Sequence, residues 1–584
     1  MKNDGKKTKR LVFAAAAAAV LVCAGALLWH EKSAAAPAIA PAAAKTAVAY
    51  VPLDDRTDNT DYVEYEAAAC GYTLYMPDRS LYTTRLDGQG DNPNGTQYGS
   101  REALLQWVRR MDESGCNIFL ISLDQLFSGG LVNSRSVSGS PPLRIDEGEL
   151  SEEDAFDKFI LALGEDKANR VYLFDSVMRL ASTVGYQGLG LTQYTALREY
   201  GSVARKTLSG AELTLDNIFA AYPYGADGVT PAEKYVSGGP SKEIIEGYLA
   251  ARERKLRLID HVMDSVRGNS AFRLVVGVDD SAGGDNIHTN ELAYIAARIG
   301  GGTLLPGMDS LARLQLARIV LDGGGKSITA DVQYFGGEED KPSSDYDNGT
   351  LRDAVDAHLR FLGAKQARSG QLSVLVLTAP AEGKRKADCV DALIGALKTN
   401  GRLGKPTILV DASRDKYGAG LNDKLLSGAD FAGLMGYCGR YDQASVTGAA
   451  LAMGFSRCGY LLNGGEGCGA AHVRQLANSM ILSMVYSSGS VHYDINQYIL
   501  SLGFEYTNIA ATPGDMTRIE SELLHMLRDK SGAVLQNLAS GAVKTDLHGG
   551  VQKVRSAEIT GASFPWHRSF EVSLGIEVAM EPTA

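Results

Sequence analysis

The chain has 584 residues, of which 45% are apolar and 22% are charged. This composition is too apolar for an intrinsically disordered chain and too mixed for a coiled coil, so it indicates a globular protein. The formal net charge is -11, and it becomes about -15 without residues 1–44, which carry six basic and two acidic side chains. Such an acidic balance argues against nucleic acid or an anionic membrane surface as a partner of the globular part.

Residues 1–45 have the composition of a targeting segment. Basic residues between Lys2 and Arg10 precede the uncharged run Leu11–Leu28, and an Ala/Pro-rich stretch follows. The run is long for a signal peptide and short for a membrane span, so it suits both a cleaved signal peptide and a retained anchor on an Ala/Pro tether. In both cases the basic residues before the run predict export of the rest, and thus an extracytoplasmic protein that is secreted or held at the membrane by this segment.

A short apolar run, an acidic or polar cluster and a helical stretch recur in this order along residues 46–485. Continuous apolar runs of this length are typical of parallel strands that helices cover on both faces. Amphipathic helices are expected at 100–111, 241–267, 290–299 and 310–321. Strands are expected at 47–53, 72–76, 117–123, 170–174, 272–278, 303–308, 373–377, 407–410 and 431–436.

The alternation of strands and helices indicates an α/β fold. Eight or nine strands within about 400 residues favour a (β/α)8-like barrel with insertions, and an open doubly wound parallel sheet is the alternative. Residues 183–240, rich in Tyr, Gly and Thr, interrupt the pattern and are predicted to be an insertion. Residues 486–584 are predicted to form a mostly helical C-terminal part, which ends in an alternating segment at 564–578 suited to a strand pair or a sheet edge.

The residues that directly follow the predicted strands form the candidate site, because parallel α/β folds bind ligands at the carboxyl ends of their strands. Glycoside hydrolysis needs such carboxylates: one protonates the leaving oxygen, and another stabilises the sugar cation or activates water. Each Asp has a structural alternative, since Asp after a strand is also a common helix N-cap. The candidates on this face are Asp54, Asp55, Arg56, Asp124, Asp175, Arg179, Asp279, Asp280, Asp309 and Asp411.

Two segments of this face place polar groups for substrate binding. Residues 52–56 carry two carboxylates and a guanidinium in succession, for which a local salt bridge is the alternative explanation. Residues 122–135 contain a Gly pair that would allow a ligand to approach the backbone at Gly130. Arg135 follows this pair and could bind a carboxylate or a hydroxyl-rich substrate.

A third segment, residues 279–291, is the first choice for the catalytic centre. It combines acids, glycines and the amide of Asn286 in one loop-to-helix turn that reaches Glu291. Arg56, Arg135 and Arg179 would hold the substrate together with Asn286. The residues predicted to be catalytic are Asp279, Asp280 and, as the opposite carboxylates, Asp175 and Asp124.

Motifs of other enzyme classes do not occur in the chain. There is no G-x-S-x-G, H-E-x-x-H or Walker sequence, so a serine hydrolase, a zinc protease and a P-loop enzyme have no support. The nine histidines are scattered, which argues against a metal site built on histidine. No cofactor is therefore predicted, although the same carboxylates could coordinate a hard divalent cation.

Five motifs resemble those of a bacterial domain-of-unknown-function family, number 4127, over roughly residues 47–580. The chain departs from the family pattern at Thr57, at Ser310 and in GYCGRYDQASVTG at 436–448. The resemblance implies an exported or envelope-associated bacterial protein, and it supports the fold and the site without naming a reaction. The motifs are VPLDDR at 51–56, SLDQLFSGGLVNSR at 122–135, VDDSAGGDN at 278–286, LPGMDSLARLQLAR at 305–318 and PWHRSFEV at 565–572.

These observations predict an exported hydrolase that acts on a carbohydrate, in the first place a glycosidase for cell-wall or host glycans. One alternative is a protein that binds a glycan or the cell wall without turnover. Another is a hydrolase or isomerase that uses the same acids around a divalent metal. Carboxylates about 5 to 10 Å apart across an open cleft would support the glycosidase, whereas carboxylates buried in salt bridges with Arg56 and Arg179 would contradict it.

Overall fold

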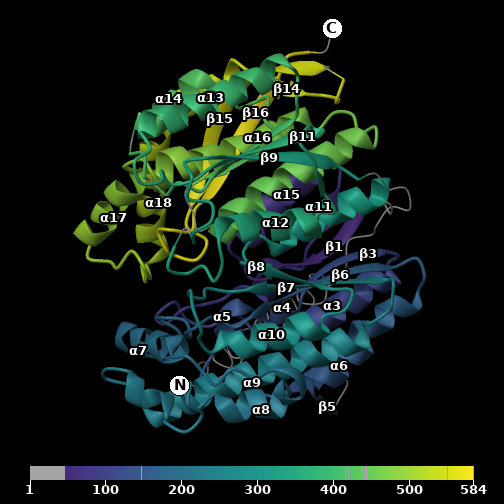
Figure 1. The fold of residues 1–584 in the computed structure, drawn as a ribbon, viewed down its shortest axis with the longest axis vertical. Helices are drawn as coiled ribbons and strands as arrows, with labels where there is room; N and C mark the ends of the chain where they lie inside the picture. Colours follow the sequence, from purple (N-terminus) through teal and green to yellow (C-terminus); the bar gives the residue numbers. More distant parts are fainter. Residues whose placement is uncertain are drawn as a thin grey trace, which may run out of the picture.

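The computed structural model describes residues 46–582, except residues 146–147, 326, 343, 415, 419, 440–442 and 549. The targeting segment predicted at residues 1–45 lies outside the described residues. Among the helices that the structure describes, none is long and apolar enough to cross a membrane. The predicted α/β class is confirmed, and most described strands belong to two separate parallel sheets (Figure 1).

The first parallel sheet has six strands in the order β2-β1-β3-β6-β7-β8. Each strand lies within or over a run predicted from the sequence. One boundary was wrong: β6 continues through Asp175 to Val177, so Asp175 lies inside a strand and not after it. The strands are β1 (Ala47–Val51), β2 (Thr73–Tyr75), β3 (Ile118–Ser122), β6 (Arg170–Val177), β7 (Phe272–Val278) and β8 (Thr303–Pro306).

The second parallel sheet has five strands in the order β10-β9-β11-β12-β13. Strand β9 was not predicted, because polar residues interrupt its apolar pattern. The apolar run at 431–436 was wrongly predicted as a strand, since Phe431 and its neighbours fill the core and pairing begins only at Gly436. The strands are β9 (Thr329–Phe335), β10 (Lys365–Gln366), β11 (Leu372–Leu377), β12 (Thr407–Asp411) and β13 (Gly436–Gly439).

The favoured single barrel is not what the described residues form. Strand β9 starts a new sheet and does not pair with β8, because the helix between them, α11 (Leu311–Gly324), lies between the two sheets (Figure 1). Each sheet is open, with its first strand inside and its second at the edge, as in the doubly wound alternative. In this arrangement ligands bind at the carboxyl ends of the strands, where the strand order reverses.

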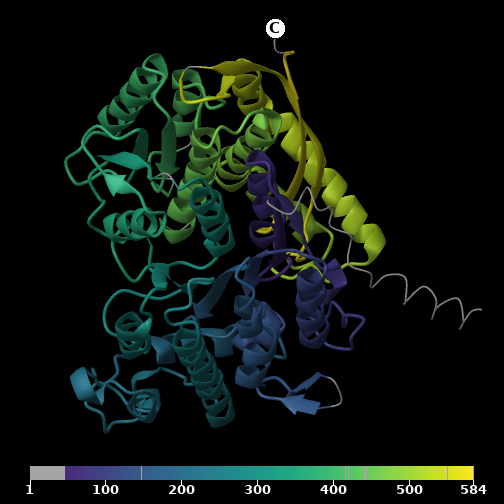
Figure 2. The same cartoon turned by 90° about the vertical axis from the view of Figure 1, so that its right-hand side faces the viewer.

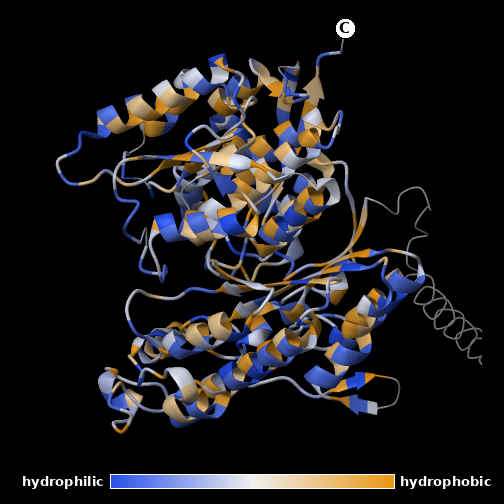
Figure 3. Cartoon of the chain, turned by 45° about the vertical axis from the view of Figure 1, so that its right-hand side comes forward, coloured by the Kyte–Doolittle hydropathy of each residue, from blue (hydrophilic) through white to orange (hydrophobic). Residues whose placement is uncertain are grey.

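Both faces of each sheet are covered, which explains why the strands are apolar without alternation. In β1, Ala49 and Val51 belong to an outer core, whereas Val48 and Tyr50 belong to a core shared by both sheets. Figure 3 shows the resulting hydrophobic strands between helices of mixed hydropathy. The outer face of the first sheet is covered by α3 (Arg101–Glu113), α6 (Glu152–Phe159), α9 (Lys242–Ser265) and α10 (His288–Arg298).

A layer of helices is buried between the two sheets (Figure 1). The predicted helices at 100–111, 241–267, 290–299 and 310–321 are confirmed as α3, α9, α10 and α11. Besides α11, the middle layer contains α2 (Asp61–Ala69), α12 (Leu351–Phe361) and α15 (Gln443–Leu462). The far face of the second sheet is covered by α13 (Lys386–Arg402), α14 (Gly420–Gly428) and α16 (Gly469–Met480).

Two further regions join this layered body. Residues 183–240 contain the helices α7 (Leu191–Ser202) and α8 (Leu215–Ala221). The C-terminal region has three helices and then a long antiparallel hairpin, drawn in yellow in Figure 2. The segment predicted to alternate at 564–578 is partly the loop of this hairpin. The elements are α17 (Val491–Ser501), α18 (Pro513–Lys530), α19 (Gly532–Ala539), β14 (Ala542–Lys544), β15 (Val551–Ser563) and β16 (Ser573–Met580).

Candidate functional site

A cavity of about 360 Å³ lies at the carboxyl edge of the first sheet. Loops that follow five strands of that sheet line part of the cavity. The middle helices and the C-terminal hairpin complete its wall. Its aromatic lining comes from α2 and from the hairpin loop, with Tyr62, Tyr65, Trp566 and Phe570. Five residues predicted from the sequence line it: Arg56, Arg135, Arg179, Asp280 and Asp309.

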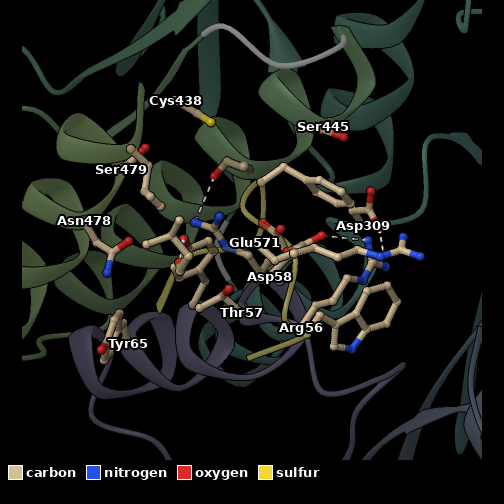
Figure 4. Close-up of a pocket in the computed structure, with 18 of the residues that line it drawn as sticks. Arg56, Thr57, Asp58, Tyr65, Asp309, Cys438, Ser445, Asn478, Ser479 and Glu571 are labelled. Atoms are coloured by element: carbon tan, nitrogen blue, oxygen red, sulfur yellow. Dashed lines mark hydrogen bonds and ion pairs between the residues drawn. The ribbon is translucent and has the colours of Figure 1, made fainter. Parts of the chain in front are cut away.

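One group of lining residues is an acidic cluster near Arg56, which we define as Asp58, Asp309 and Glu571 (Figure 4). The Arg56 guanidinium donates to Asp309 Oδ1 through Nη2 at 2.7 Å, and its Nη1 lies 3.7 Å from Glu571 Oε1. The ring of Trp566 lies under the same guanidinium, 5.1 Å from its carbon. One cation therefore joins carboxyl groups from β8 and from the hairpin loop.

The acidic cluster has more carboxyl groups than its cation can balance. Burial, assisted by the charge of Asp309, raises the pKa of Asp58 to about 7. Burial also raises the pKa of Glu571 well above its usual range, against the opposing effect of Arg56. Near neutral pH, protons therefore remain on part of the cluster, which is the condition for a carboxyl group to act as a proton donor.

The remaining acids of the first motif hold the site in place. Asp54 is fully buried, and its carboxylate accepts from Arg56 Nε at 2.9 Å and from Asn59 Nδ2 at 3.0 Å. Asp55 accepts from Trp566 Nε1 at 2.6 Å, which attaches the hairpin loop to the end of β1. Both carboxylates thus position cavity residues and do not line the cavity themselves.

A second group of lining residues is an arginine wall, which we define as Arg135, Arg179 and Arg568. Arg135 Nη1 donates to Asp279, and Arg179 Nη1 donates to Asp280 Oδ2 at 3.2 Å. Burial, followed by the charge of Arg179, lowers the pKa of Arg135 to about 10. Guanidinium groups that lie close enough for their charges to repel each other are suited to binding an anion.

A turn of two glycines places Arg135 at the cavity. Gly129 has a φ of 77°, and a Cβ there would lie 2.6 Å from the Tyr98 ring. Gly130 has a φ of 128°, and a Cβ there would meet Thr84 and the side chain of Gln125. The close approach that glycine allows at Gly130 is therefore to protein atoms. Only glycine fits this turn, after which the short helix α5 (Leu131–Ser134) leads to Arg135.

Two of the predicted catalytic acids, Asp124 and Asp175, lie beneath the cavity. Both contact the ammonium group of Lys255 on α9, with Asp175 Oδ1 at 2.8 Å, and Asp124 also accepts from Ser176. Burial opposes the charge of Lys255, but the two carboxylates outweigh it and raise the pKa of Lys255. All three side chains are at most 5% exposed, so this is a buried ion cluster within the structure.

Three further candidates are also bound within the protein. Glu291 accepts from Arg252 Nε at 2.8 Å and from the Tyr222 hydroxyl at 2.6 Å. Asn286 donates to the carbonyl groups of residues 282 and 284 and thus holds its own loop. Asp411, at the end of β12 in the second sheet, accepts from the backbone N–H of Ser413 at 3.1 Å. None of the three lines the cavity.

Carboxylates buried in salt bridges with Arg56 and Arg179 would contradict a glycosidase. Both arginines do form salt bridges with carboxylates. Two of the paired carboxylates, Asp309 and Asp280, have side chains that are 34% and 40% exposed. The other two, Asp54 and Glu571, which also pair with Arg56, are buried, so the condition against a glycosidase is met in part. Asp279 is 8% exposed behind Arg135. Of the four acids predicted to be catalytic, Asp280 is the one that a ligand in the cavity can reach.

Sequence reasoning missed Asp58, Arg568 and Glu571. Asp58 extends the run of acids that begins at Asp54, so it could have been found by continuing the motif along the loop. Arg568 and Glu571 belong to PWHRSFEV, a segment dense in charged and aromatic residues between two alternating stretches. No group of three or more His, Cys, Asp or Glu with the geometry of a metal site occurs among the described residues.

Comparison with known proteins places the chain in a family. The model of a family described as "Protein of unknown function (DUF4127)" matches residues 48–575, nearly the whole chain. The chain belongs to this family. The resemblance of the five motifs is thereby confirmed, and the cavity lies within the matched region of this DUF4127 member. No curated protein and no solved structure matches the chain.

Proposed function

We propose that this DUF4127 protein is a glycoside hydrolase whose chemistry is centred on Asp58 and Asp309. The observation that carries the proposal is that Asp309 and Glu571 contact one guanidinium in a cavity that Asp58 also lines. Glycosidases need a protonated and a charged carboxyl group within about 10 Å of each other. Arg56 contacts both Asp309 and Glu571, which keeps carboxyl groups of the cluster within such a range.

The two carboxyl groups have different roles in this proposal. Asp58, with a pKa raised to about 7, protonates the oxygen of the leaving group. Asp309, held by Arg56 and exposed at the cavity, stabilises the sugar cation or activates the attacking water. Trp566, Tyr62 and Tyr65 offer apolar ring faces against which a sugar can stack.

The sign of the pH dependence follows from the raised pKa of Asp58. The protonated donor is present below pH 7 and is lost as the pH rises through about 7. Hydrolysis is therefore expected to decline above neutral pH. This decline is expected to be absent in Asp58→Asn, which has no titrating group at that position.

The two roles can be separated with substrates of different leaving groups. Asp58→Asn is expected to slow cleavage of a natural glycosidic bond by about 10²–10⁴-fold. On a dinitrophenyl glycoside, whose leaving group needs no protonation, the same variant should retain activity within about tenfold of the wild type. Asp309→Asn should lose activity on both substrates. Release of reducing sugar or dinitrophenol measures these rates on peptidoglycan fragments and on neutral and acidic oligosaccharides.

Asp285→Asn is the matched control, because Asp285 is exposed near the same loops and does not line the cavity. Equal losses by Asp58→Asn on both leaving groups would contradict the role of Asp58 as the acid. A wild-type protein that binds a glycan of the panel but cleaves none would instead be a glycan-binding protein, and the hydrolase proposal would be wrong.

We further propose that residues 1–45 export the protein, so that it meets its glycan outside the cytoplasm. The basic residues before the apolar run support this orientation. Fusion of residues 1–45 to alkaline phosphatase, an enzyme that is active only after export, tests it. Phosphatase activity in whole cells is the expected result, and its absence together with a stable fusion protein would contradict export.

A further inference from the structure

Two groups of charged side chains line the cavity. The first is the acidic cluster of Asp58, Asp309 and Glu571, together with Arg56. The second is the arginine wall of Arg135, Arg179 and Arg568. The proposed bond cleavage uses only the acidic cluster, so the arginine wall has no role in it so far.

The arginine wall has one more cation than it has anionic partners. Arg135 pairs with Asp279, and Arg179 pairs with Asp280. Arg568 forms no ion pair within the part of the chain that the structure describes. It donates to the carbonyl oxygen of Val184 at 3.1 Å and stacks against the rings of Trp566 and Phe570. The carboxyl group whose charge favours that of Arg568 is Glu571, but the two form no ion pair.

The surroundings of Arg568 disfavour its charge. Burial and the nearby cations Arg179, Arg135 and Arg56 lower its pKa to about 10. Glu571 acts in the opposite direction, and burial raises the pKa of that carboxyl group as well. An anion that enters the cavity would relieve this repulsion, because it would gain charge-assisted hydrogen bonds from more than one guanidinium.

The loop that carries Arg568 is fixed in place. Trp566 binds Asp55 at the end of β1, and the carbonyl of His567 accepts from Ile509 N at 2.7 Å. His567 has a φ of 52°, a left-handed conformation that is unfavourable for a residue other than glycine. Such strain is retained where the surrounding structure enforces it, often at ligand sites. The Arg568 cation is thus held at the cavity by several independent contacts.

We propose that the arginine wall binds an oxyanion on the substrate, so that the protein acts on an acidic glycan, for example one with a uronic acid carboxylate. The oxyanion lies against Arg135 and Arg568, and Arg179 adds its charge. The glycosidic bond then lies toward the acidic cluster. The assignment rests on the proposed function for the cleaved bond, but the anion site itself does not require turnover.

Binding of sugars that differ only in their charged group tests this proposal. Glucuronate, glucose 6-sulfate, glucose 6-phosphate and uncharged glucose are titrated into the protein, and calorimetry measures each dissociation constant. At least one of the charged sugars is expected to bind at least about tenfold more tightly than glucose, since charged pairs add to a shared sugar contact. The sugar that binds most tightly identifies the oxyanion as a carboxylate, a sulfate ester or a phosphate ester.

Arg568→Gln is expected to remove this preference, so that the charged sugar binds no more tightly than glucose does. Arg555→Gln is the matched control, because Arg555 is exposed on β15, outside the cavity. If Arg568→Gln does not fold, the wild type provides the test: its affinity for the charged sugar must fall as NaCl is raised from 20 to about 300 mM, while that for glucose stays constant.

Three results would overturn the anion site: no charged sugar binds more tightly than glucose, the preference is independent of salt, or the preference survives in a folded Arg568→Gln protein. The same titrations with Asp58→Asn separate this inference from the proposed function. A preference for the charged sugar in a protein that cleaves no glycan would support the anion site and contradict only the hydrolase. Cleavage of neutral glycans alone would support the hydrolase and contradict the acidic substrate.

Discussion

Two groups of ion pairs lie at the same edge of the first sheet, and they differ in what covers them. Lys255 and Arg252, both on α9, bind Asp124, Asp175 and Glu291 in the interior. Arg56 and Arg179 bind Asp309 and Asp280, whose side chains are about one third or more exposed at the cavity. An acid that follows a parallel strand is thus a structural residue where a covering helix supplies a cation that pairs with it. It is a candidate site residue where no helix covers that edge of the sheet.

The largest effect on stability is expected when the buried ion pairs of Lys255 are removed. Lys255→Met leaves two carboxylates without their cation in the interior, which should lower the free energy of unfolding by about 3–5 kcal/mol. Urea unfolding followed by circular dichroism measures this loss. Lys242→Met, on the same helix but 84% exposed, should change it by less than about 0.5 kcal/mol. A loss below about 1 kcal/mol in Lys255→Met would contradict the structural role of this group.

A smaller loss is expected when the buried group loses a single hydrogen bond. Tyr222→Phe removes the hydroxyl that donates to Glu291 and leaves the pairing with Arg252 intact. The free energy of unfolding should fall by about 1.5–3 kcal/mol, the range for a hydrogen bond to a charged group. Tyr224→Phe is its control, since that side chain is 39% exposed. Equal stability of the two variants would show that Glu291 does not depend on Tyr222.

The smallest effect on stability is expected in the open group. Asp309→Asn weakens a partly exposed ion pair, so the free energy of unfolding should change by no more than about 1 kcal/mol, although hydrolysis is lost. Thermal unfolding and glycan cleavage measured on the same sample give both values. If Asp309→Asn were as unstable as Lys255→Met, the difference between covered and open ion pairs would not hold.

Local patterns predicted much of the fold and part of the site. The apolar runs located most strands of the two parallel sheets, and the residues after them included Arg56, Asp280 and Asp309 at the cavity. Such local patterns could not predict how the strands are arranged into sheets. A run covered on both faces looks the same in a barrel and in an open sheet, because only pairing between distant strands distinguishes them. The separation of β8 from β9 by α11 is such a non-local feature.

The sorting of candidates into covered and open groups also depended on distant residues. Lys255 contacts Asp124, which lies 131 positions away in the sequence. Within its own segment, Lys255 has the pattern of an ordinary side chain of an amphipathic helix. Glu571 and Arg568 reach the cavity from the C-terminal hairpin. Their segment was noticed for its resemblance to the family, but nothing in its local pattern indicated which strand edge it would meet.

The contact between Trp566 and Asp55 joins residues 511 positions apart, and it has a consequence for when the cavity forms. During synthesis the first sheet and its acids emerge long before the hairpin loop that closes the cavity. Until that loop arrives, Arg56 has no Glu571 and the arginine wall has no Arg568. Ligand binding would therefore report the completion of the whole molecule, and a chain that stops short of the hairpin would be unable to bind even with its first sheet fully folded.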